Sequence, residues 1–439
     1  MKVLKFGGTS VGSAQRMKDV AKLITDGEQK IVVLSAMSGT TNTLVEISDY
    51  LYKKNPEGAN EVINKLEAKY KQHIEELYST EEYKQKTSEF VKSVFDYIRS
   101  FTKDLFTLFE EKVILAQGEI ISTNMVTNYL CEQGVKAVLL PALEFMRTDK
   151  NSEPDLTYIR EKLAVQLEEH PGQEIYITQG FICRNAYGEI DNLQRGGSDY
   201  TASLIGAAIN ASEIQIWTDI DGMHDNDPRI VDHTSPVRQL HFEEAAELAY
   251  FGAKILHPTC VQPAKYANIP VRLLNTMEPA APGTLISNDT EKGKIKAVAA
   301  KDNITAIKIK SSRMLLAHGF LRKVFEIFES YQTAIDMVCT SEVGVSMSID
   351  NTKHLNEIID DLKKYGTVTV DHDMCIVCVV GDLEWENVGF EAKALDAMRD
   401  IPVRMISFGG SNYNISFLIR ESDKKKALQS LSDVLFNHK

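Results

Sequence analysis

The feature that most constrains the fold is an alternation of short apolar strands with helices at the start of the chain. The segments Val3–Phe6 and Ile31–Leu34 are apolar and β-prone, and Ala14–Ile24 between them has helical spacing. Apolar strands joined by helices are typical of a parallel sheet with both faces covered. The sequence therefore predicts an α/β fold with an open, mostly parallel sheet sandwiched by helices. Further strand signals follow at Lys136–Leu140, Glu174–Thr178, Glu213–Thr218 and Ile269–Leu274.

A long helical stretch interrupts this alternation. Residues 58–131 are rich in Glu, Lys and Leu and nearly lack proline. Such a stretch is longer than a crossover connection needs, so we expect a helical insertion or a lid. Turn-forming residues gather at Glu278–Thr284, and we place the end of the first domain, residues 1–290, just beyond them.

The last part of the chain contains an internal repeat. Aligning Gly319 with Gly389, an offset of 389 − 319 = 70 residues, also places Ser341 on Ser411 without a gap. Each copy has the pattern helix, strand, polar turn, strand and helix, with a further strand before it, which is the order of a ferredoxin-like α+β unit. Two small copies without evident catalytic residues indicate a ligand-binding or pairing module. We predict domains at residues 300–372 and 373–439, with a strand at 293–300 as a candidate to complete the second.

Composition limits the partners and the compartment. The net charge of −13 over 439 residues disfavours nucleic acid and anionic membrane surfaces. No charged-then-apolar leader precedes the first strand, and apolar runs such as Met374–Val380 are too short to span a bilayer. The six cysteines are scattered, which suits a reducing, cytoplasmic location. Cys375 and Cys378 fit a buried strand better than a metal or redox pair, because residues i and i+3 of a strand point to opposite faces.

Candidate chemistry begins at Lys5-Phe6-Gly7-Gly8-Thr9-Ser10. Glycines after a strand let backbone N–H groups approach a phosphate, and the next helix directs its positive end to the same place. Lys5 would add a full charge there. A second strand ends in a similar turn at Ser38-Gly39, and open α/β sheets bind ligands at the carboxyl ends of their strands. Taken alone, the first turn fits a plain tight turn as well as a phosphate site.

A second glycine pair lies in Arg195-Gly196-Gly197-Ser198-Asp199-Tyr200, before a helix of small apolar residues. Ser198 or Asp199 can simply cap that helix. The glycines and Arg195 can also bind an anion, and the two interpretations do not exclude each other.

Three other segments carry weaker signals. The first contains acidic residues that could bind ribose or magnesium, in Trp217–Gly222 and Asp227-Pro228-Arg229. Taken alone, this stretch is better interpreted as Asp-rich turns. Lys254, in Phe251–Pro258, has a solvated surface charge as its default interpretation. Gly118-Glu119 falls within a helical pattern, where glycine indicates close packing or ligand approach.

Taken together, these motifs resemble the ordered motifs of the aspartokinases over essentially the whole chain. The first is partly shared with the wider amino-acid kinase superfamily, and the repeat resembles the paired C-terminal ACT domains of aspartokinases. The resemblance implies an amino-acid kinase fold followed by two ferredoxin-like ACT domains, without the homoserine dehydrogenase part of the fused enzymes. The motifs are Lys5–Ser10, Gln117–Glu119, Met146–Asp149, Arg195–Ala202, Trp217–Asp219, Asp227–Arg229 and Phe251–Lys254.

The resemblance implies transfer of the ATP γ-phosphoryl group to the β-carboxylate of L-aspartate, giving 4-phospho-L-aspartate, the first step toward lysine, threonine and methionine. Lys5 would stabilise the transferring phosphoryl group, and Asp199 would organise that lysine. Mg²⁺ would arrive with the nucleotide, because no dedicated metal site is visible. Aspartate would be held by Ser35, Thr41, Glu119, Arg195 and Ser198. ATP would be bound by Lys5, Gly7, Gly8, Thr218, Asp219, His224, Arg229, Lys254 and Ile255.

The repeat copies would carry feedback control and pairing. The loop at Met314–Leu321 resembles the effector loop of lysine-sensitive members, and lysine or threonine is the expected effector. Ala317 stands where those members often carry serine. The turn Ser411–Asn414 is expected to support a homodimer through the ACT domains, and higher assembly stays open. The effector residues would be Met314, His318, Gly319, Leu321, Asp336, Thr340, Ser341 and Glu342.

Two alternatives remain at this point. One is another acyl-phosphate-forming amino-acid kinase, acting on glutamate or acetylglutamate. The other is an amino-acid sensor that has kept the fold and lost catalysis. The motif Arg195–Asp199 and the repeat favour the aspartokinase over the first, and the complete set of motif residues favours it over the second.

Overall fold

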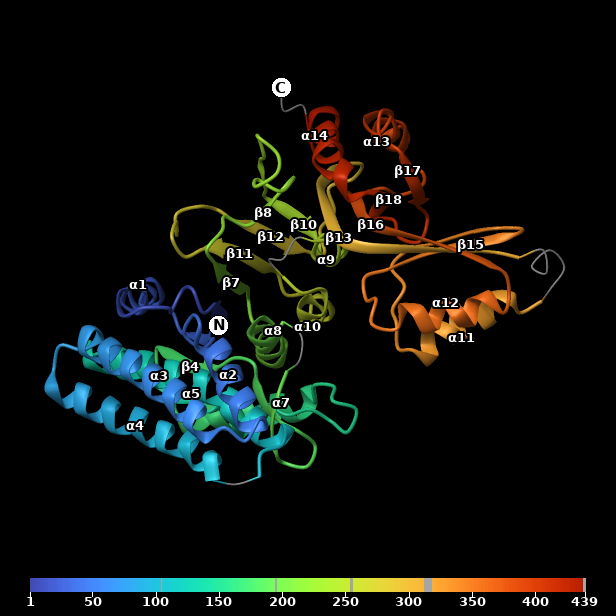
Figure 1. The fold of residues 1–439 in the computed structure, drawn as a ribbon. Coiled ribbons are helices and arrows are strands. Elements are labelled where there is room, and N and C mark those ends of the chain that lie inside the picture. The colour runs from blue at the N-terminus through green and yellow to red at the C-terminus, as the bar shows by residue number, and fades with distance from the viewer. Residues whose placement is uncertain (104, 194–195, 253–255, 312–317, 437–439) are drawn as a thin grey trace. The chain divides into compact units, whose positions relative to one another are not determined.

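The computed structural model describes all residues except 104, 194–195, 253–255, 312–317 and 437–439 (Figure 1). The chain forms two compact units, residues 1–223 with 255–288 and residues 224–254 with 289–439. We describe each unit separately.

A mostly parallel sheet forms the centre of the first unit. Six neighbouring strands on one side of β12 are parallel to one another, and β12 itself runs antiparallel to β11. Every residue of β2 (Lys30–Leu34) is buried, as expected of a central strand that is covered on both faces. The predicted sheet is therefore confirmed. In spatial order the strands are β12 (Thr284–Ser287), β11 (Val271–Asn275), β7 (Ile214–Thr218), β1 (Lys2–Phe6), β2, β4 (Ile175–Gln179) and β3 (Ala137–Leu140).

The long helical stretch predicted between residues 58 and 131 consists of three helices. They are α3 (Pro56–Leu77), α4 (Glu81–Ser100) and α5 (Leu108–Glu132), and they pack side by side with α2 (Thr40–Tyr52) (Figure 1). Thr107 begins α5 with a capping box that includes Glu110. A shared hydrophobic core joins these helices to the sheet, so the stretch is an integral layer of the unit.

The remaining elements of this unit complete the covering of the sheet. They are the helices α1 (Ala14–Ile24), α6 (Ala142–Phe145), α7 (Leu156–Glu169), α8 (Gly197–Ile209) and α10 (Gln262–Tyr266), the 3-10 helices Phe101–Lys103 and Pro258–Val261, and the hairpin of β5 (Ile182–Arg184) and β6 (Ile190–Asn192).

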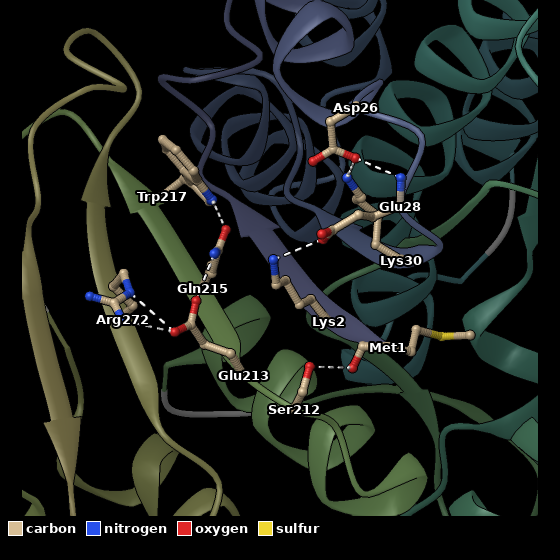
Figure 2. A network of polar contacts seen from close by, with 10 residues as sticks. All are labelled: Met1, Lys2, Asp26, Glu28, Lys30, Ser212, Glu213, Gln215, Trp217 and Arg272. Carbon is tan, nitrogen blue, oxygen red and sulfur yellow. Dashed lines mark hydrogen bonds and ion pairs between the residues drawn. The ribbon is translucent and has the colours of Figure 1, made fainter.

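Polar contacts hold the amino-terminal edge of the sheet, where its parallel strands begin (Figure 2). Lys2 of β1 pairs with Glu28 at 2.8 Å, and Arg272 of β11 pairs with Glu213 at 3.0 Å. Lys30 of β2 pairs with Asp26. These contacts fix the strands at one edge, while the glycine-containing turns follow the same strands at the opposite, carboxyl edge.

An antiparallel sheet forms the centre of the second unit. Helices α11 (Phe320–Ser330) and α12 (Leu355–Lys363) belong to the first repeat copy, and α13 (Phe390–Ala397) and α14 (Lys424–Leu435) belong to the second (Figure 1). In spatial order the strands are β14 (Val338–Ser341), β15 (Gly344–Ile349), β13 (Ile295–Lys310), β16 (Thr367–Gly381), β18 (Asn414–Arg420) and β17 (Val403–Ser407). The unit also contains β8 (Met223–His224) paired with β9 (Pro236–Val237), β10 (Gln239–His241), α9 (Phe242–Tyr250) and the 3-10 helix Glu421–Asp423.

Strands β13 and β16 each run through both repeat copies. The Thr305–Lys310 part of β13 pairs with β15, which belongs to the first copy. The Ile295–Lys301 part pairs with the Ile376–Gly381 part of β16, which in turn pairs with β18 of the second copy. The register shifts between Lys301 and Ala306, where the two parts meet. This pairing supports a strand near 293–300 as part of the second copy; the domain boundaries themselves stay a prediction.

Cys375 and Cys378 are buried in β16, as the apolar run predicted, and both thiols are free. Burial raises the pKa of both thiols, so they remain protonated. In the part of the chain that the structure describes, no helix is long and apolar enough to cross a membrane.

Candidate active site

A pocket of about 410 Å³ opens at the carboxyl ends of β1, β2 and β4 in the first unit. It lies where the two glycine turns and the start of α8 come together, which is the edge that the sheet topology predicts for a ligand. Its lining consists of Lys5, Gly8, Ser35, Ala36, Met37, Ser38, Gly39, Thr41, Asn42, Glu119, Phe181, Gly196, Gly197 and Ser198.

Lys5 and Asp199 form an ion pair at this pocket. The Lys5 Nζ atom lies 2.7 Å from Asp199 Oδ1, and the two side chains are only 11% and 16% exposed. A Cβ atom on Gly7 would stand 3.5 Å from the same nitrogen, so glycine leaves space beside the amine. The ion pair keeps the Lys5 ammonium group at the end of β1.

The two glycine turns pack directly against each other. A Cβ atom on Gly8 would lie 2.8 Å from the carbonyl oxygen of Ala36, a distance that real Cβ atoms do not adopt against backbone. The Ser38 N–H donates to the Gly8 carbonyl at 3.1 Å. Glycine at position 8 is therefore required for the approach of the turn after β1 to the turn after β2.

Two helices begin at the pocket without a capping side chain. Gly39 precedes α2 with φ 83°, and Gly196 precedes α8 with φ 69°, both in the left-handed region that favours glycine. Neither residue offers a side-chain acceptor to the first turn, so N–H groups of both helices are available to an anion. The interpretation of Ser198 or Asp199 as the cap of α8 is wrong, because Gly196 occupies the cap position and Asp199 pairs with Lys5.

Glu119 of α5 supplies a buried carboxylate to the same pocket. Its residue is 4% exposed, and its Oε1 atom accepts from the Ala36 N–H at 3.2 Å. Its Oε2 atom is buried and has no hydrogen-bond partner among the described residues. Burial raises the pKa of Glu119 to about 7. The geometry suits an acceptor for a cationic group of a ligand, which would keep the carboxylate ionised.

Gly118 allows α5 to bring Glu119 into the pocket. A Cβ atom on Gly118 would lie 2.8 Å from the Cβ of Ala36. The close packing that glycine indicated within the helical pattern is therefore confirmed, and it brings α5 against the turn after β2.

Hydroxyl groups connect the turn after β2 to α8. Ser35 Oγ donates to Ser198 Oγ at 2.9 Å, and Ser122 donates to the Ser35 carbonyl at 2.8 Å. A Cβ atom on Gly180 would lie 2.5 Å from Ser198, so glycine is required there as well.

Sequence reasoning missed Phe181. This residue lines the pocket with φ 70°, which is rare for a bulky side chain, and its N–H donates to Thr201 Oγ1 at 3.0 Å. Its ring contacts the position where a Gly197 side chain would stand. The available signal was Gly180-Phe181, which follows the predicted strand Glu174–Thr178 after one residue, since that strand ends at the same edge of the sheet.

The predicted nucleotide residues are only partly brought together. Thr218 and Asp219 follow β7, which pairs with β1, and Thr218 Oγ1 accepts from the Ile220 N–H at 3.3 Å as part of a turn. His224 and Arg229 belong to the second unit. His224 Nδ1 lies 2.9 Å from Thr234 Oγ1, and Arg229 is exposed and bound to Asp227 at 2.7 Å. Arg195, Lys254 and Ile255 lie outside the described residues.

The motif Met146–Asp149 serves local structure. Arg147 pairs with Asp155 at 2.5 Å and lies over the ring of Tyr158 at 3.7 Å from its centroid. Asp149 accepts the N–H groups of Asn151 and Glu153 and closes a turn.

The predicted effector residues lie in the first repeat copy. Gly319 precedes α11 with φ 86°, and Asp336 has a buried carboxylate. His318, Leu321, Thr340, Ser341 and Glu342 are exposed, and Met314 lies outside the described residues.

Comparisons with known proteins identify relatives over the full length. Residues 1–275 match the amino acid kinase family, and residues 377–435 match the ACT domain. Aspartokinase 1, chloroplastic, of Arabidopsis thaliana is 35% identical and covers 99% of this chain and 80% of its own length. The crystal structure of E. coli aspartokinase III in complex with aspartate and ADP (R-state) has a TM-score of 0.84 at 31% identity, covering 99% of this chain and 100% of that one. The same enzyme with lysine and aspartate (T-state) has a TM-score of 0.82 at 32% identity, covering 99% of each chain.

A mostly parallel sheet with two glycine turns at its carboxyl edge, together with the match over residues 1–275, defines a member of the amino acid kinase family with a C-terminal ACT domain. Within that class the relatives covering nearly the whole chain are aspartokinases. The chain belongs to the aspartokinase family. The predicted fold class is confirmed, and so is the predicted activity, an ATP-dependent kinase whose acceptor is the carboxyl group of aspartate.

Proposed function

We propose that the pocket at the carboxyl ends of β1, β2 and β4 is where the β-carboxylate of L-aspartate meets the γ-phosphate of ATP. The observation that carries this proposal is the Lys5–Asp199 ion pair, 2.7 Å long, beside two helix starts without capping side chains. Two anions repel each other in water, and a site that joins them needs fixed positive charge and N–H donors. The protein carries a net charge of −13, so these groups must be local.

Several side chains at the pocket have a role in this proposal. The unpaired Oε2 of Glu119 accepts the α-ammonium group of aspartate, and Arg195 with the start of α8 receives a carboxylate. Ser35, Thr41 and Ser198 add hydroxyl contacts. The substrate carboxylate is already ionised at neutral pH, so an oxygen of it attacks the γ-phosphorus and ADP leaves without a general base. Lys5 stabilises the charge on the transferring group, and Asp199 keeps the Lys5 amine in position.

For the nucleotide we propose contacts from both glycine turns and from the residues after β7. Gly7 and Gly8 would bring the backbone of the first turn to the phosphates, and Gly8 lines the pocket. The nucleotide set is completed by Thr218, Asp219, His224, Arg229, Lys254 and Ile255. Among the described residues, no group of three or more His, Cys, Asp or Glu side chains is arranged to hold a metal. Mg²⁺ would arrive on the phosphates of ATP, where it would neutralise phosphate charge.

We further propose that lysine or threonine inhibits the enzyme by binding the first repeat copy. E. coli aspartokinase III has been crystallised with lysine and aspartate in a T-state, and Asp336 here supplies a buried carboxylate to the predicted effector set. The effector set is Met314, His318, Gly319, Leu321, Asp336, Thr340, Ser341 and Glu342. The proposal includes a homodimer through the ACT domains, a role early in lysine, threonine and methionine synthesis, and a cytoplasmic location that suits six free thiols.

The decisive experiment is a kinase assay with aspartate, glutamate and acetylglutamate side by side, with the acyl phosphate trapped by hydroxylamine. We expect turnover with aspartate and little with the other two. A preference for glutamate would overturn the assignment of the pocket, and aspartate binding without turnover would indicate a sensor. Inhibition titrations with lysine, threonine and methionine, alone and in pairs, test feedback; insensitivity to both lysine and threonine would remove that part of the proposal.

A further inference from the structure

The turn after β2 and the start of α2, residues 35–42, supply a large part of the pocket wall. All of these residues except Thr40 line the pocket. Thr40 is the first residue of α2 and is 1% exposed, so its side chain is buried behind the wall. Its two neighbours in the chain, Gly39 and Thr41, both line the pocket. A contact that fixes Thr40 therefore also fixes two lining residues.

Tyr70 of α3 makes such a contact with Thr40. The two hydroxyl oxygens lie 2.9 Å apart, a hydrogen-bond distance, and Tyr70 is also only 1% exposed. The centroid of the Tyr70 ring lies 5.9 Å from that of Phe95 on α4, so packing within the helical layer holds the ring in place. A Cβ atom on Gly118 would lie 3.3 Å from Thr40 Cγ2, so α5 packs against the methyl group of the same threonine.

Lys69, the neighbour of Tyr70 on α3, contacts the same turn two residues earlier. Its Nζ atom donates to the Ser38 carbonyl at 3.2 Å. Glu119 accepts the Ala36 N–H at 3.2 Å, so the turn is held at positions 36, 38 and 40. Two of these three contacts come from α3, a helix that itself supplies no residue to the pocket lining.

Tyr70 also lies near the carboxylate that the proposed function assigns to the substrate ammonium group. Burial raises the pKa of Tyr70, and the charge of Glu119 adds to the rise, so the phenol is neutral at physiological pH. A neutral phenol can both donate to and accept from the Thr40 hydroxyl. The hydrogen bond between them is therefore kept over the whole pH range in which the protein is expected to function.

We propose that Tyr70 is a positioning residue for aspartate, which acts by holding Thr40 and with it the turn that carries Thr41. Lys69 acts in the same way through the Ser38 carbonyl. The helical layer then has a function in substrate binding besides covering the sheet. This inference rests on the proposed aspartate site, because Tyr70 itself does not line the pocket.

The test is the Tyr70→Phe variant of the full chain, with aspartate binding measured by calorimetry without nucleotide. The ring and its packing remain, and only the hydroxyl is lost. An ordinary buried hydrogen bond contributes enough that we expect the Kd for aspartate to rise roughly 3- to 10-fold. An unchanged Kd would overturn the positioning role.

Tyr78→Phe is a matched control from the same helical layer. Tyr78 follows the end of α3, is buried, and donates its hydroxyl to the Met125 carbonyl of α5 at 2.7 Å. The variant removes the same kind of bond without touching the turn after β2. We expect the Kd for aspartate to stay at the wild-type value, and an equal rise in both tyrosine variants would contradict the inference.

A double variant separates positioning from stability. Tyr70→Phe leaves the buried Thr40 hydroxyl without this partner, so the melting temperature should fall. Thr40→Val in the same chain replaces that hydroxyl with a methyl group, and removing both partners of a buried hydrogen bond is nearly neutral for stability. The double variant should therefore regain most of the melting temperature while the Kd for aspartate stays raised, because the turn still lacks the bond. Recovery of both quantities would show a purely structural role and overturn the inference.

Lys69→Gln tests the same helix from its exposed side, where a substitution leaves the core intact. We expect the Kd for aspartate to rise roughly 2- to 5-fold, as for the loss of an exposed charged contact. Lys65→Gln removes the same charge one turn earlier on α3, where Lys65 pairs with Glu61 at 2.7 Å, and should leave the Kd unchanged. Equal effects of the two lysine variants would overturn the part of the proposal that concerns Lys69.

Glu119→Gln, measured in the same way, shows which proposal fails. Weak binding by Glu119→Gln together with wild-type binding by Tyr70→Phe would overturn the positioning role and leave the proposed aspartate site in place. Wild-type binding by Glu119→Gln would show that aspartate binds elsewhere, which would overturn the proposed site and this inference together. We expect both variants to bind aspartate more weakly than the wild type.

Discussion

The amine of Lys5 lies 2.7 Å from the carboxylate of Asp199, and the pair joins the end of the first strand to the first turn of α8. Neither group is expected to lose or gain a proton in the proposed reaction. Their function in this arrangement is to place one positive charge where a phosphoryl group passes between two anions.

Replacing Lys5 with alanine should therefore reduce turnover while aspartate binding is largely kept. Removal of a preorganised charge that stabilises a transition state reduces kcat by roughly 10²- to 10³-fold. Steady-state kinetics and calorimetric titration of aspartate check the two parts. Lys2→Ala is the matched control, because Lys2 lies on the same strand and pairs with Glu28 at the opposite edge of the sheet (Figure 2). An unchanged kcat in Lys5→Ala would refute the role.

Aspartate affinity should depend on pH through Glu119. Burial raises the pKa of this carboxyl to about 7, and only its ionised form attracts the ammonium group of the ligand. We expect the Kd for aspartate to rise as pH falls below 7, approaching about tenfold per pH unit, and to level off above 7. Calorimetry without nucleotide avoids the titration of ATP itself. Glu119→Gln should bind weakly at every pH, and a wild-type Kd that is flat from pH 5.5 to 8 would contradict the prediction.

The same carboxyl should lower stability at neutral pH. Because its pKa is raised in the folded protein, the folded state holds the proton more tightly than the unfolded chain, and stability falls as pH rises from 4.5 toward 7. Glu119→Gln lacks this penalty and keeps an acceptor for the Ala36 N–H. Its advantage in the free energy of unfolding should grow between pH 5 and pH 8 by roughly 2–3 kcal/mol. Urea titrations of the ligand-free proteins measure it, and an advantage that does not grow would show that Glu119 is not held at a raised pKa.

Gly118→Ala tests the packing of α5 against the turn after β2. Helix propensity alone predicts a gain of about 1 kcal/mol for alanine within a helix. The added Cβ would stand 2.8 Å from the Cβ of Ala36, so we expect a loss of roughly 1–3 kcal/mol instead. Ala36→Gly in the same chain should restore most of it. Gly410→Ala, where nothing lies within 4 Å of the added atom, is the control, and stabilisation by Gly118→Ala would contradict the packing.

Chelation of Mg²⁺ should stop turnover without affecting the fold. The described residues hold no cluster that could bind a metal by itself, and the metal in the proposed reaction arrives with ATP. EDTA should abolish kinase activity and leave the melting temperature of the nucleotide-free protein unchanged. A fall in that temperature would show a structural metal site.

Much of the fold could be predicted from local signals. The first strands lack the alternation of polar and apolar residues that a half-exposed strand has, which predicts a sheet covered on both faces. Glycine turns mark the residues at which these strands end. Among the site residues, Lys5 and Glu119 could be predicted because each lies in a recognisable motif. The structure places both at one pocket. Their roles remain proposals.

Other features depend on contacts between distant parts of the chain. Phe181 adopts a positive φ because its N–H reaches Thr201 and its ring packs at Gly197, which nothing in the local sequence specifies. The strand predicted before the first repeat copy is part of the longer β13, because the polar residues Lys301–Asn303 shift the register without ending the pairing with β16. Asn303 takes φ 58° there, a conformation that asparagine tolerates well.

Because β13 and β16 each serve both copies, the regulatory half of the molecule cannot be divided between them. A chain truncated after residue 372 would keep Ile295–Lys301 and lose Ile376–Gly381, its partner across the sheet. Ile295–Lys301 would then be an edge strand with unpaired backbone N–H and C=O groups. Such an edge can pair with other chains and cause aggregation. Any viable shortening of this protein, in evolution or in the laboratory, should therefore delete both copies together or neither.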